Sequence, residues 1–593
     1  MISPASRPSA MSFGTPPREL VEEALAAQQS LTAVERFSTR HDEGSLPDNK
    51  SFYRDLIPLR APEAGEQYAF EVDLDRCTGC KACVTACHNL NGLDEDETWR
   101  HVGVLQRASA GGSLRETPGV RGFSAGLIET LKPVQQHVTT ACHHCADPGC
   151  AQGCPTLAYE KDPETGVVRH LDDQCFGCQY CILKCPYDVP QYSAKRGIVR
   201  KCDLCIGRLR AGEAPACAQA CPTQAIRVTL VATAAVVAAP SAAFDLPGAP
   251  DPSRVMPTTR YRTTRGLPED MTALDAAQAR PEHAHLPLVA MLTASQAAAG
   301  YWILLALSAL SSTVFLPTPD TRLPTVFPLA EILGVIGVQF ALGLSLLHLG
   351  RPLLAWKAFL GWRRSWLSRE VIAFSSLAGT TGLYAAFAFG EWGVKKFLGV
   401  DIRTSGYADI ATIARAGLAF GVIASCFAAL YASAMVYRDT PRALWATRAT
   451  LWRFGLTAVV TGIPAWLFVG TLSGHVVPSG ASTILLTAMV IGQLSKLRLE
   501  SSLLSHRNDD DPNALWKGAR LLFGALQPAW FARIFLALLG GIILPIAVAA
   551  EELNVSAPVG IGAILMLTLA GELAERYLFF VTTIAPRMPG GRK

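Results

Sequence analysis

Long apolar stretches fill the second half of the chain and are nearly absent from the first half. Eight such runs follow His285, at about 286–312, 328–348, 371–390, 416–437, 454–474, 476–495, 534–550 and 555–580. Most are close to the ~20 residues that a helix needs to cross the hydrocarbon of a bilayer. The sixth and seventh are short or interrupted by polar residues, and a soluble helical domain is the alternative. The pattern predicts an all-α polytopic membrane domain of about eight helices over residues 286–593.

The first 285 residues divide into three further segments. Residues 1–66 begin with a Pro- and Ser-rich stretch, and apolar positions then recur at helical spacing from Arg18 to Arg36. This N-terminal extension is predicted to hold a helix that docks on a partner or packs on its own domain. Residues 67–235 contain almost all the cysteines. Residues 236–285, rich in Pro and Ala, are predicted to be a linker that either lies over that domain or reaches a partner.

Composition excludes several classes of protein. Half of the residues are hydrophobic, 17% are charged and the mean hydropathy is +0.25, which excludes a disordered or fibrous chain. The formal net charge of +4 is too small to indicate a nucleic-acid partner, so none is expected. The first twenty residues contain neither an apolar signal core nor a twin arginine.

Sixteen of the seventeen cysteines form four groups. The first and third groups have the spacing C-x2-C-x2-C-x3-C, and a proline follows the last cysteine of three groups. In bacterial ferredoxins with this spacing, three thiolates bind one [4Fe–4S] cluster and the fourth binds the neighbouring cluster. Small residues such as Gly79 and Gly177 allow the tight turns that converging thiolates require. The groups are Cys77, Cys80, Cys83, Cys87; Cys142, Cys145, Cys150, Cys154; Cys175, Cys178, Cys181, Cys185; and Cys202, Cys205, Cys217, Cys221.

This pattern predicts four [4Fe–4S] clusters in an α+β ferredoxin-like domain built from paired bacterial-ferredoxin repeats. Zinc sites also use C-x2-C pairs, but tetrahedral zinc needs two pairs rather than repeated triplets with a trailing Cys-Pro. A disulfide framework requires an oxidising compartment, and the N-terminus carries no secretion signal.

The cysteine region resembles the four-cluster ferredoxin-type subunit of dimethyl-sulfoxide-reductase-like molybdenum enzymes. The similar segments are DLDRCTGCKACVTACHNLNG, TTACHHCADPGCAQGCPTLAY, DDQCFGCQYCILKCPYDVP and KCDLCIGRL…ACAQACPTQAI. The resemblance implies that the outer groups share their clusters and that the inner groups do likewise. Cys221 would then join the first group's cluster, Cys87 the fourth group's, Cys185 the second group's and Cys154 the third group's. Such a subunit conducts electrons and has no catalytic residues of its own.

The membrane domain offers few candidates for redox chemistry. A transmembrane haem b with two histidine ligands needs both at matching depth, but His348 and His475 fall at opposite faces of the eight predicted spans. No haem is therefore expected. Ionisable side chains inside spans are costly, which makes them candidates for function.

Three motifs resemble the polysulfide-reductase/DMSO-reductase membrane anchor family: HLGRP at 348–352, SWLSRE at 365–370 and GELAERYLFF at 571–580. That resemblance implies eight helices, no haem and a quinone site near the face that carries the iron–sulfur subunit. It makes His348, Gly350 and Arg351 the first candidates for quinone binding, with Gln296, Glu572 and Arg576 second. Quinol oxidation must release protons and bond both oxygens, and a histidine beside an arginine suits both needs.

Lys and Arg concentrate in the loops on the side of the membrane that holds the N-terminus. The positive-inside rule then predicts a multi-pass protein of the inner (cytoplasmic) membrane with its iron–sulfur domain on the cytoplasmic face.

These patterns together predict a fused electron-transfer and membrane-anchor subunit of a molybdopterin-dependent oxidoreductase. It would pass electrons between the membrane quinone pool, as exchangeable substrate, and a separate molybdopterin-containing catalytic subunit, because too few residues remain here for a pterin-binding domain. The alternative is a quinone-linked iron–sulfur module that exchanges electrons with a cytochrome or a soluble ferredoxin, without a molybdenum partner.

Overall fold

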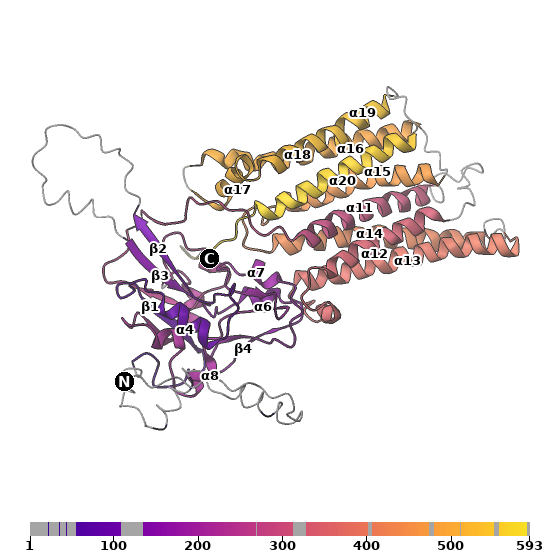
Figure 1. Ribbon diagram of the computed structural model, residues 1–593. Coiled ribbons are helices and arrows are strands. Elements are labelled where there is room, and N and C mark those ends of the chain that lie inside the picture. The colour runs from indigo at the N-terminus through magenta and orange to yellow at the C-terminus, as the bar shows by residue number, and fades with distance from the viewer. Residues whose placement is uncertain are drawn as a thin grey trace, which may run out of the picture.

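The computed structural model describes residues 55–107, 135–242, 244–268, 270–311, 328–400, 406–473, 479–509, 512–550 and 557–589, with positions 22, 35, 43 and 402. The predicted docking helix at 18–36 and the residue His475 lie outside these ranges. Two units are seen in Figure 1, a mixed α/β unit that includes the N-terminal strands and a bundle of long helices that runs away from it.

Small sheets and short helices make up the first unit. Strand β1 pairs antiparallel with β8 and parallel with β9, and β2 lies between β10 and β3. The pairs β4–β5 and β6–β7 are two-stranded. The strands are β1 (Glu66–Asp73), β2 (His101–Arg107), β3 (Gln135–Thr140), β4 (Tyr159–Lys161), β5 (Val168–His170), β6 (Gln191–Ser193), β7 (Ile198–Arg200), β8 (Ile226–Ala232), β9 (Arg260–Arg262) and β10 (Met271–Ala273).

Four of the short helices carry cysteines: α4 (Ala82–Leu90), α6 (Gly149–Gly153), α7 (Tyr180–Lys184) and α9 (Ala216–Gln219). Helix α4 packs on α9, and α6 packs on α7. The outer helices of the sequence therefore pair, and so do the inner ones, as in a duplicated ferredoxin repeat. The prediction of an α+β ferredoxin-like domain is confirmed. The remaining short helices are α8 (Ile206–Arg210), α10 (Thr233–Ala238) and η1 (Pro252–Arg254).

Part of the segment assigned to the linker is built into the first unit. Strand β9 extends the β1 sheet, with Glu71 opposite Arg260, and β10 extends the β2 sheet, with Met271 opposite Arg107. Phe244, which precedes them, is buried in the same apolar core as Phe70. Of the two alternatives for this segment, the structure has the one in which it lies over the cysteine domain.

Eight helices in the second unit are long and apolar enough to cross a membrane. This confirms the predicted number, including the sixth and seventh spans. The sixth joins α16 to the 3-10 helix η5, and the seventh joins α18, the π-helical turn η6 and α19. The elements of this unit are α11 (Leu286–Leu310), α12 (Leu329–Leu346), η3 (Pro352–Phe359), α13 (Trp366–Leu398), α14 (Ala408–Arg438), α15 (Ala449–Leu472), α16 (Ser479–Ser501), η5 (Ser502–Asn508), α17 (Ala514–Phe523), α18 (Gln527–Leu538), η6 (Leu539–Ile543), α19 (Leu544–Ala549) and α20 (Ala557–Val581).

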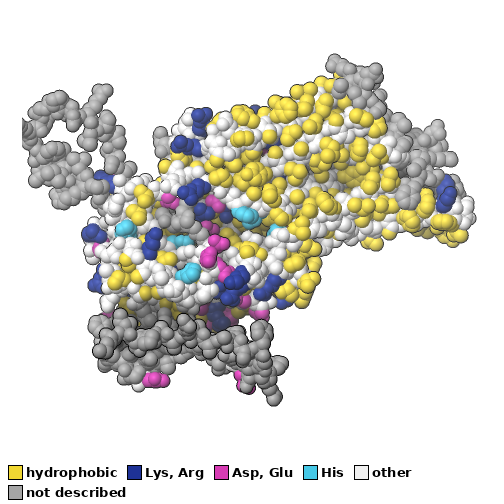
Figure 2. Space-filling model, viewed as in Figure 1, with side chains coloured by type: hydrophobic (Ala, Val, Ile, Leu, Met, Phe, Trp, Pro, Cys, Tyr) yellow, Lys and Arg dark blue, Asp and Glu magenta, His cyan; other side chains and the backbone are white. Residues whose placement is uncertain are grey.

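The helical bundle has the surface and the packing of a membrane protein. Hydrophobic side chains cover its outer face, whereas charged side chains gather on the first unit and at the junction (Figure 2). Inside the bundle, α11 and α15 meet backbone to backbone, since a Cβ added at Gly300 would lie 1.9 Å from the carbonyl oxygen of Ala458. Small residues allow this close approach, which takes the place of a hydrophobic driving force between helices in lipid.

Direct hydrogen bonds fasten the two units together. The backbone amide of Arg351 donates to Phe176 O at 3.0 Å, and that of Gly361 donates to Pro155 O at 2.7 Å. On the other side of the junction, Lys184 Nζ pairs with Asp439 Oδ2 at 2.7 Å. The cysteine helices α6 and α7 therefore rest directly on the ends of the membrane helices.

Candidate functional site

The backbone turns in the same way in each of the four cysteine groups. The residue two positions after the first cysteine has a left-handed conformation in each group, with φ of 74° at Gly79, 41° at His144, 76° at Gly177 and 61° at Leu204. Glycine adopts this conformation without steric cost, whereas other residues do not. The glycines could therefore be recognised from sequence, but His144 and Leu204 could not.

In each group, a thiol of another group lies close to the group's own thiols. Burial raises the pKa of Cys77, and the nearby thiols of Cys83, Cys221 and Cys80 raise it further. Burial together with Cys217 raises the pKa of Cys87 to about 12. In the same way, the nearby thiols of Cys150 and Cys142 raise the pKa of Cys185. Those of Cys178, Cys175 and Cys154 raise the pKa of Cys181.

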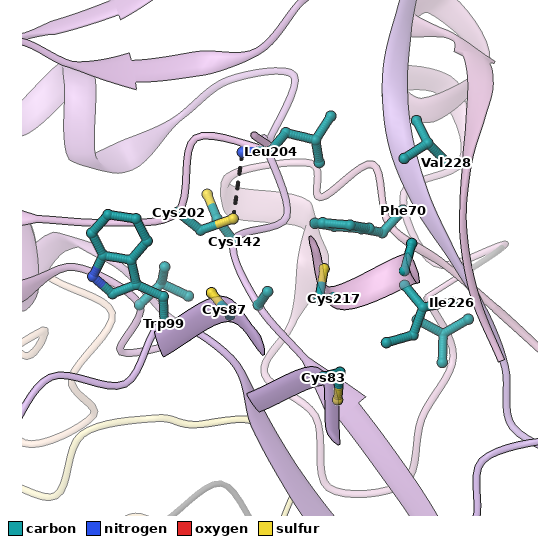
Figure 3. Packing of buried hydrophobic residues seen from close by; sticks show 14 of the residues in the cluster. Phe70, Cys83, Cys87, Trp99, Cys142, Cys202, Leu204, Cys217, Ile226 and Val228 are labelled. Carbon is teal, nitrogen blue, oxygen red and sulfur yellow. Dashed lines mark hydrogen bonds between the residues drawn. The ribbon is translucent and has the colours of Figure 1, made fainter. Parts of the chain in front are cut away.

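Thiols of different groups thus lie close together, and these neighbours fit the four sets of four that the family resemblance implies. Neighbours also occur between sets, since Cys217 lies near Cys83 and Cys142 lies near Cys202. The sets are Cys77, Cys80, Cys83 with Cys221; Cys202, Cys205, Cys217 with Cys87; Cys142, Cys145, Cys150 with Cys185; and Cys175, Cys178, Cys181 with Cys154. Helix packing explains the exchange, because α4 lies on α9 and α6 on α7. Figure 3 shows Cys87, Cys202 and Cys217 brought into one apolar cluster with Phe70 and Trp99.

The chemistry of these sets fits an iron–sulfur cluster. A cubane binds its thiolates at separate corners, and cysteine is its usual ligand. Backbone amides point at the sulfurs: Ala158 N donates to Cys154 Sγ and Ala225 N to Cys221 Sγ, both at 3.2 Å. Burial makes bare thiolates costly here, and iron would supply the compensating positive charge.

Two buried cations lie among the thiols. Arg100 is 1% exposed, stacks on Phe70 and donates to Thr139 Oγ1 at 3.1 Å, while its Nε and Nη2 have no partner among the described residues. Burial alone lowers the pKa of Arg100, but the thiolates of Cys217, Cys83, Cys202 and Cys87 raise it above its ordinary value. Lys201 is likewise buried, and the nearby thiols of Cys142 and Cys150 raise its pKa against the opposing effect of burial. Nothing in the cysteine motifs marks either cation as part of the site.

A pocket of about 180 Å³ lies between the two units. It is named here the interface pocket. Cys178 and Tyr180 of the first unit line it together with His348, Glu370 and Tyr437 of the second. The remaining lining is mostly aliphatic and aromatic. A cysteine that belongs to one of the four thiol sets thus shares a wall with ionisable side chains of the membrane helices.

Two buried polar atoms at the interface pocket have no hydrogen-bond partner within the described part of the chain. They are His348 Nδ1 and Glu370 Oε1. Buried polar atoms are nearly always paired, so these two acceptors beside one pocket are available to a polar ligand. In contrast, the Tyr180 hydroxyl is satisfied, because it donates to Val436 O at 2.9 Å. Glu370 ends the SWLSRE motif, but it is not among the quinone-site candidates that the motifs imply.

The predicted companions of His348 do not line the interface pocket. Gly350 packs on the backbone of Gly197, where an added Cβ would lie 2.0 Å from the carbonyl oxygen. Arg351 Nη1 donates to Asp172 O at 2.9 Å. Both residues hold the segment after α12 against the thiol unit, and so they position His348.

Gln296, Glu572 and Arg576 lie together, and none of them lines the interface pocket. Arg576 Nη2 donates to Gln296 Oε1 at 2.8 Å, and Glu572 pairs with Lys496. Glu572 and Arg576 belong to a cluster of charges, all at most 8% exposed, that links α15, α16, α18 and α20. This buried charge network consists of Arg453, Lys496, Glu500, Arg533, Glu572, Glu575 and Arg576.

Ion pairs run through the whole network. Arg533 Nη2 lies 2.7 Å from Glu500 Oε1 and 3.0 Å from Glu572 Oε1, and Arg453 pairs with Glu575. Such residues in a membrane helix are costly unless paired, and the pairing here is dense. Ion pairs therefore compensate most of these charges, although Arg576 Nε and Nη1 and Gln296 Nε2 have no hydrogen-bond partner among the described residues.

Comparison with known proteins divides the chain at the same junction. Residues 282–581 match the family described as DMSO reductase anchor subunit (DmsC). Residues 134–230 match a 4Fe-4S dicluster domain, and residues 68–89 match a 4Fe-4S binding domain.

Curated relatives resemble the first unit. The B subunit of the anaerobic dimethyl sulfoxide reductase of Haemophilus influenzae is 37% identical over 161 residues, which is 27% of this chain and 73% of the relative. The probable anaerobic dimethyl sulfoxide reductase subunit YnfG of Escherichia coli K12 is 37% identical over 160 residues, 27% of this chain and 72% of the relative. The formate dehydrogenase-O iron-sulfur subunit of the same strain is 33% identical over 176 residues, 28% of this chain and 55% of the relative.

Proposed function

Since the chain belongs to the DMSO reductase anchor subunit family and fuses that anchor to an iron–sulfur unit, we propose that it carries electrons between membrane quinone and a separate molybdenum-containing catalytic subunit. Its 4Fe-4S domains make it an electron-transfer subunit, and its eight apolar helices make it a multi-pass membrane protein. The number of clusters, the quinone and the partner belong to the proposal.

Four [4Fe–4S] clusters are proposed, one for each of the four thiol sets. The exchange of Cys87, Cys154, Cys185 and Cys221 between groups supports this assignment, since each set then holds four thiols. When bound, such clusters would relay electrons through the unit. The protein contributes burial, amide hydrogen bonds to sulfur and the cations Arg100 and Lys201, all of which influence reduction potential.

The interface pocket is proposed as the quinone site, and its position carries the functional proposal. Cys178 forms part of one wall, so a bound quinone ring would lie beside one of the proposed clusters. The volume of about 180 Å³ suits one ring, since a cavity of about 150 Å³ can hold benzene. His348 Nδ1 and Glu370 Oε1 offer acceptors for the hydroxyl groups of a quinol. A quinone tail would leave between the apolar helices.

These two side chains would accept and donate the protons of the reaction. In quinol oxidation, two hydroxyl protons and two electrons leave the ring, and clusters held by nearby cysteines such as Cys178 would take the electrons one at a time. His348 and Glu370 would accept those protons at Nδ1 and Oε1, and they would return them when quinone is reduced. The same geometry therefore serves either direction of electron flow.

The iron–sulfur unit is proposed to face the cytoplasm from the inner membrane. Arg438 ends α14, and Arg442 and Arg448 follow it, where the chain meets the iron–sulfur unit. Asp439 in that segment pairs with Lys184 of the iron–sulfur unit, so the segment lies on its side of the bundle. An excess of Lys and Arg marks the cytoplasmic side.

A test of the proposed function is to isolate the native complex in mild detergent and to assay its subunits, molybdenum and iron. We expect a large co-purifying subunit, molybdenum, and four irons for each of four clusters in this chain. Iron without molybdenum or a large partner would contradict the proposed partner and favour the quinone-linked module. Iron near half the expected content would contradict the assignment of four clusters.

Arg100 provides a test of the thiol sets. Replacing it with Leu removes a buried positive charge beside Cys83 and Cys217, so the reduction potentials of the two neighbouring clusters should fall by about 50–100 mV. Redox titration followed by electron paramagnetic resonance measures this shift. Arg100→Lys keeps the charge and should move the potentials much less. Unchanged potentials in Arg100→Leu would show that the clusters are not arranged around this cation.

A further inference from the structure

An open groove of about 660 Å³ runs along the membrane unit between α14 and α15. Its floor is formed by α11, at Gly300, Ile303 and Leu304. Its walls are apolar and open to the outside of the bundle: Phe427 is 58% exposed and Trp452 66% exposed. Helix α11 packs against both α14 and α15, and the groove lies where the three helices meet.

Two arginines stand at one end of this groove. Arg438 closes α14, and Arg448 directly precedes α15, so both lie at the end near the iron–sulfur unit. Within the described residues neither arginine forms an ion pair; Arg438 Nη1 contacts only Met435 Sδ, at 3.8 Å. The described lining of the groove contains no acid and no histidine. Two arginines without an ion-pair partner among the described residues therefore lie at one end of an apolar groove.

We infer that this groove binds one phospholipid with an anionic head group, here named the lipid groove. The head group would pair with Arg438 and Arg448, and an acyl chain would lie along Phe427, Trp452 and Val459 over the floor of α11. Basic pockets between membrane helices on the cytoplasmic side suit anionic lipid head groups. Tyr431 and Trp452 line the groove on the helical segments next to the arginines, and such aromatic side chains favour the interface of the bilayer.

Charge distinguishes this site from the interface pocket. A quinone ring is neutral and needs hydrogen-bonding partners, which the interface pocket offers at His348 and Glu370. The lipid groove instead offers two permanent cations and an open side toward the bilayer. The arginine pair therefore favours a lipid phosphate over a second quinone.

The inference can be tested by native mass spectrometry of the full chain in detergent, titrated with phosphatidylglycerol. We expect one tightly retained phosphatidylglycerol, and binding about thirtyfold weaker in the double variant Arg438→Gln, Arg448→Gln. Phosphatidylcholine should bind much less tightly, and millimolar inorganic phosphate should not displace the lipid. The matched control is Arg363→Gln, Arg364→Gln, which removes two exposed arginines outside the groove.

A second variant tests the acyl channel without touching the arginines. A Cβ at Gly455, which lines the groove, would meet no atom within 4 Å, so Gly455→Leu should fold and fill the channel. We expect it to lose the retained lipid, whereas Gly379→Leu, at an equally open site on α13, should keep it. Equal retention of phosphatidylcholine and phosphatidylglycerol, displacement by phosphate, or wild-type binding by the arginine double variant would each overturn the inference.

Discussion

Glu370→Gln is expected to slow the reduction of the iron–sulfur clusters by quinol at least about a hundredfold. The carboxylate is 5% exposed, its Oε1 has no partner among the described residues, and it lines the interface pocket beside Cys178. The amide has nearly the same shape but cannot take up a proton. The expected loss is therefore one of proton acceptance, with little change in packing or iron content.

Stopped-flow spectroscopy of the full chain in detergent or vesicles, mixed with a soluble quinol, measures this rate. His348→Ala should be slowed similarly, because its Nδ1 is the other orphaned acceptor at the pocket. The matched control is Glu331→Gln, an acid at the start of α12 that does not line the pocket. If both pocket variants are reduced at the wild-type rate while the iron content is unchanged, the quinone does not react here.

Glu572→Ala is expected to destabilise the membrane unit by about 3–5 kcal/mol. Glu572 is fully buried and pairs with both Lys496 and Arg533, so its removal leaves two buried cations short of a partner. A loss of this size should lower the midpoint of thermal unfolding by roughly 10 °C. Glu331→Ala removes an acid that is only partly buried and should change the midpoint little.

The same variant decides between two roles for the network. Measured below its unfolding temperature, Glu572→Ala should oxidise quinol at nearly the wild-type rate, because Glu572 does not line the interface pocket. A large loss of rate with unchanged stability would instead assign Glu572, Gln296 and Arg576 to quinone binding, as the family resemblance implies. Thermal unfolding in detergent and the quinol assay together separate these outcomes.

Local patterns were sufficient for much of this protein. The cysteine spacing indicates a short turn, and Gly79 and Gly177 adopt the left-handed conformation that the turn requires. Apolar runs report the length of a membrane helix, and all eight predicted spans have a helix in the structure. Both signals depend on neighbours in the chain, so the order of residues alone carries them.

Other features needed contacts between distant segments. The SWLSRE motif was recognised, but only the packing of α13 on the thiol unit turns Glu370 toward Cys178. In the sequence, Arg100 cannot be told from a surface arginine. In the structure it is buried against Phe70 of β1 and Thr139 of β3. Likewise, the segment around β9 and β10 has no strong strand pattern, and its pairing with β1 and β2 selects its path.

By itself, then, the amino-acid sequence determined a ferredoxin-like unit with sixteen grouped cysteines and an anchor of eight membrane helices. Only the tertiary structure separated two sets of polar residues that sequence motifs had grouped as one site: His348 beside the thiols, and Glu572 with Arg576 in the buried charge network. The physical reason is that a motif records which residues are near along the chain. Whether a buried charge meets a counter-ion or an open pocket depends on the helices that pack around it.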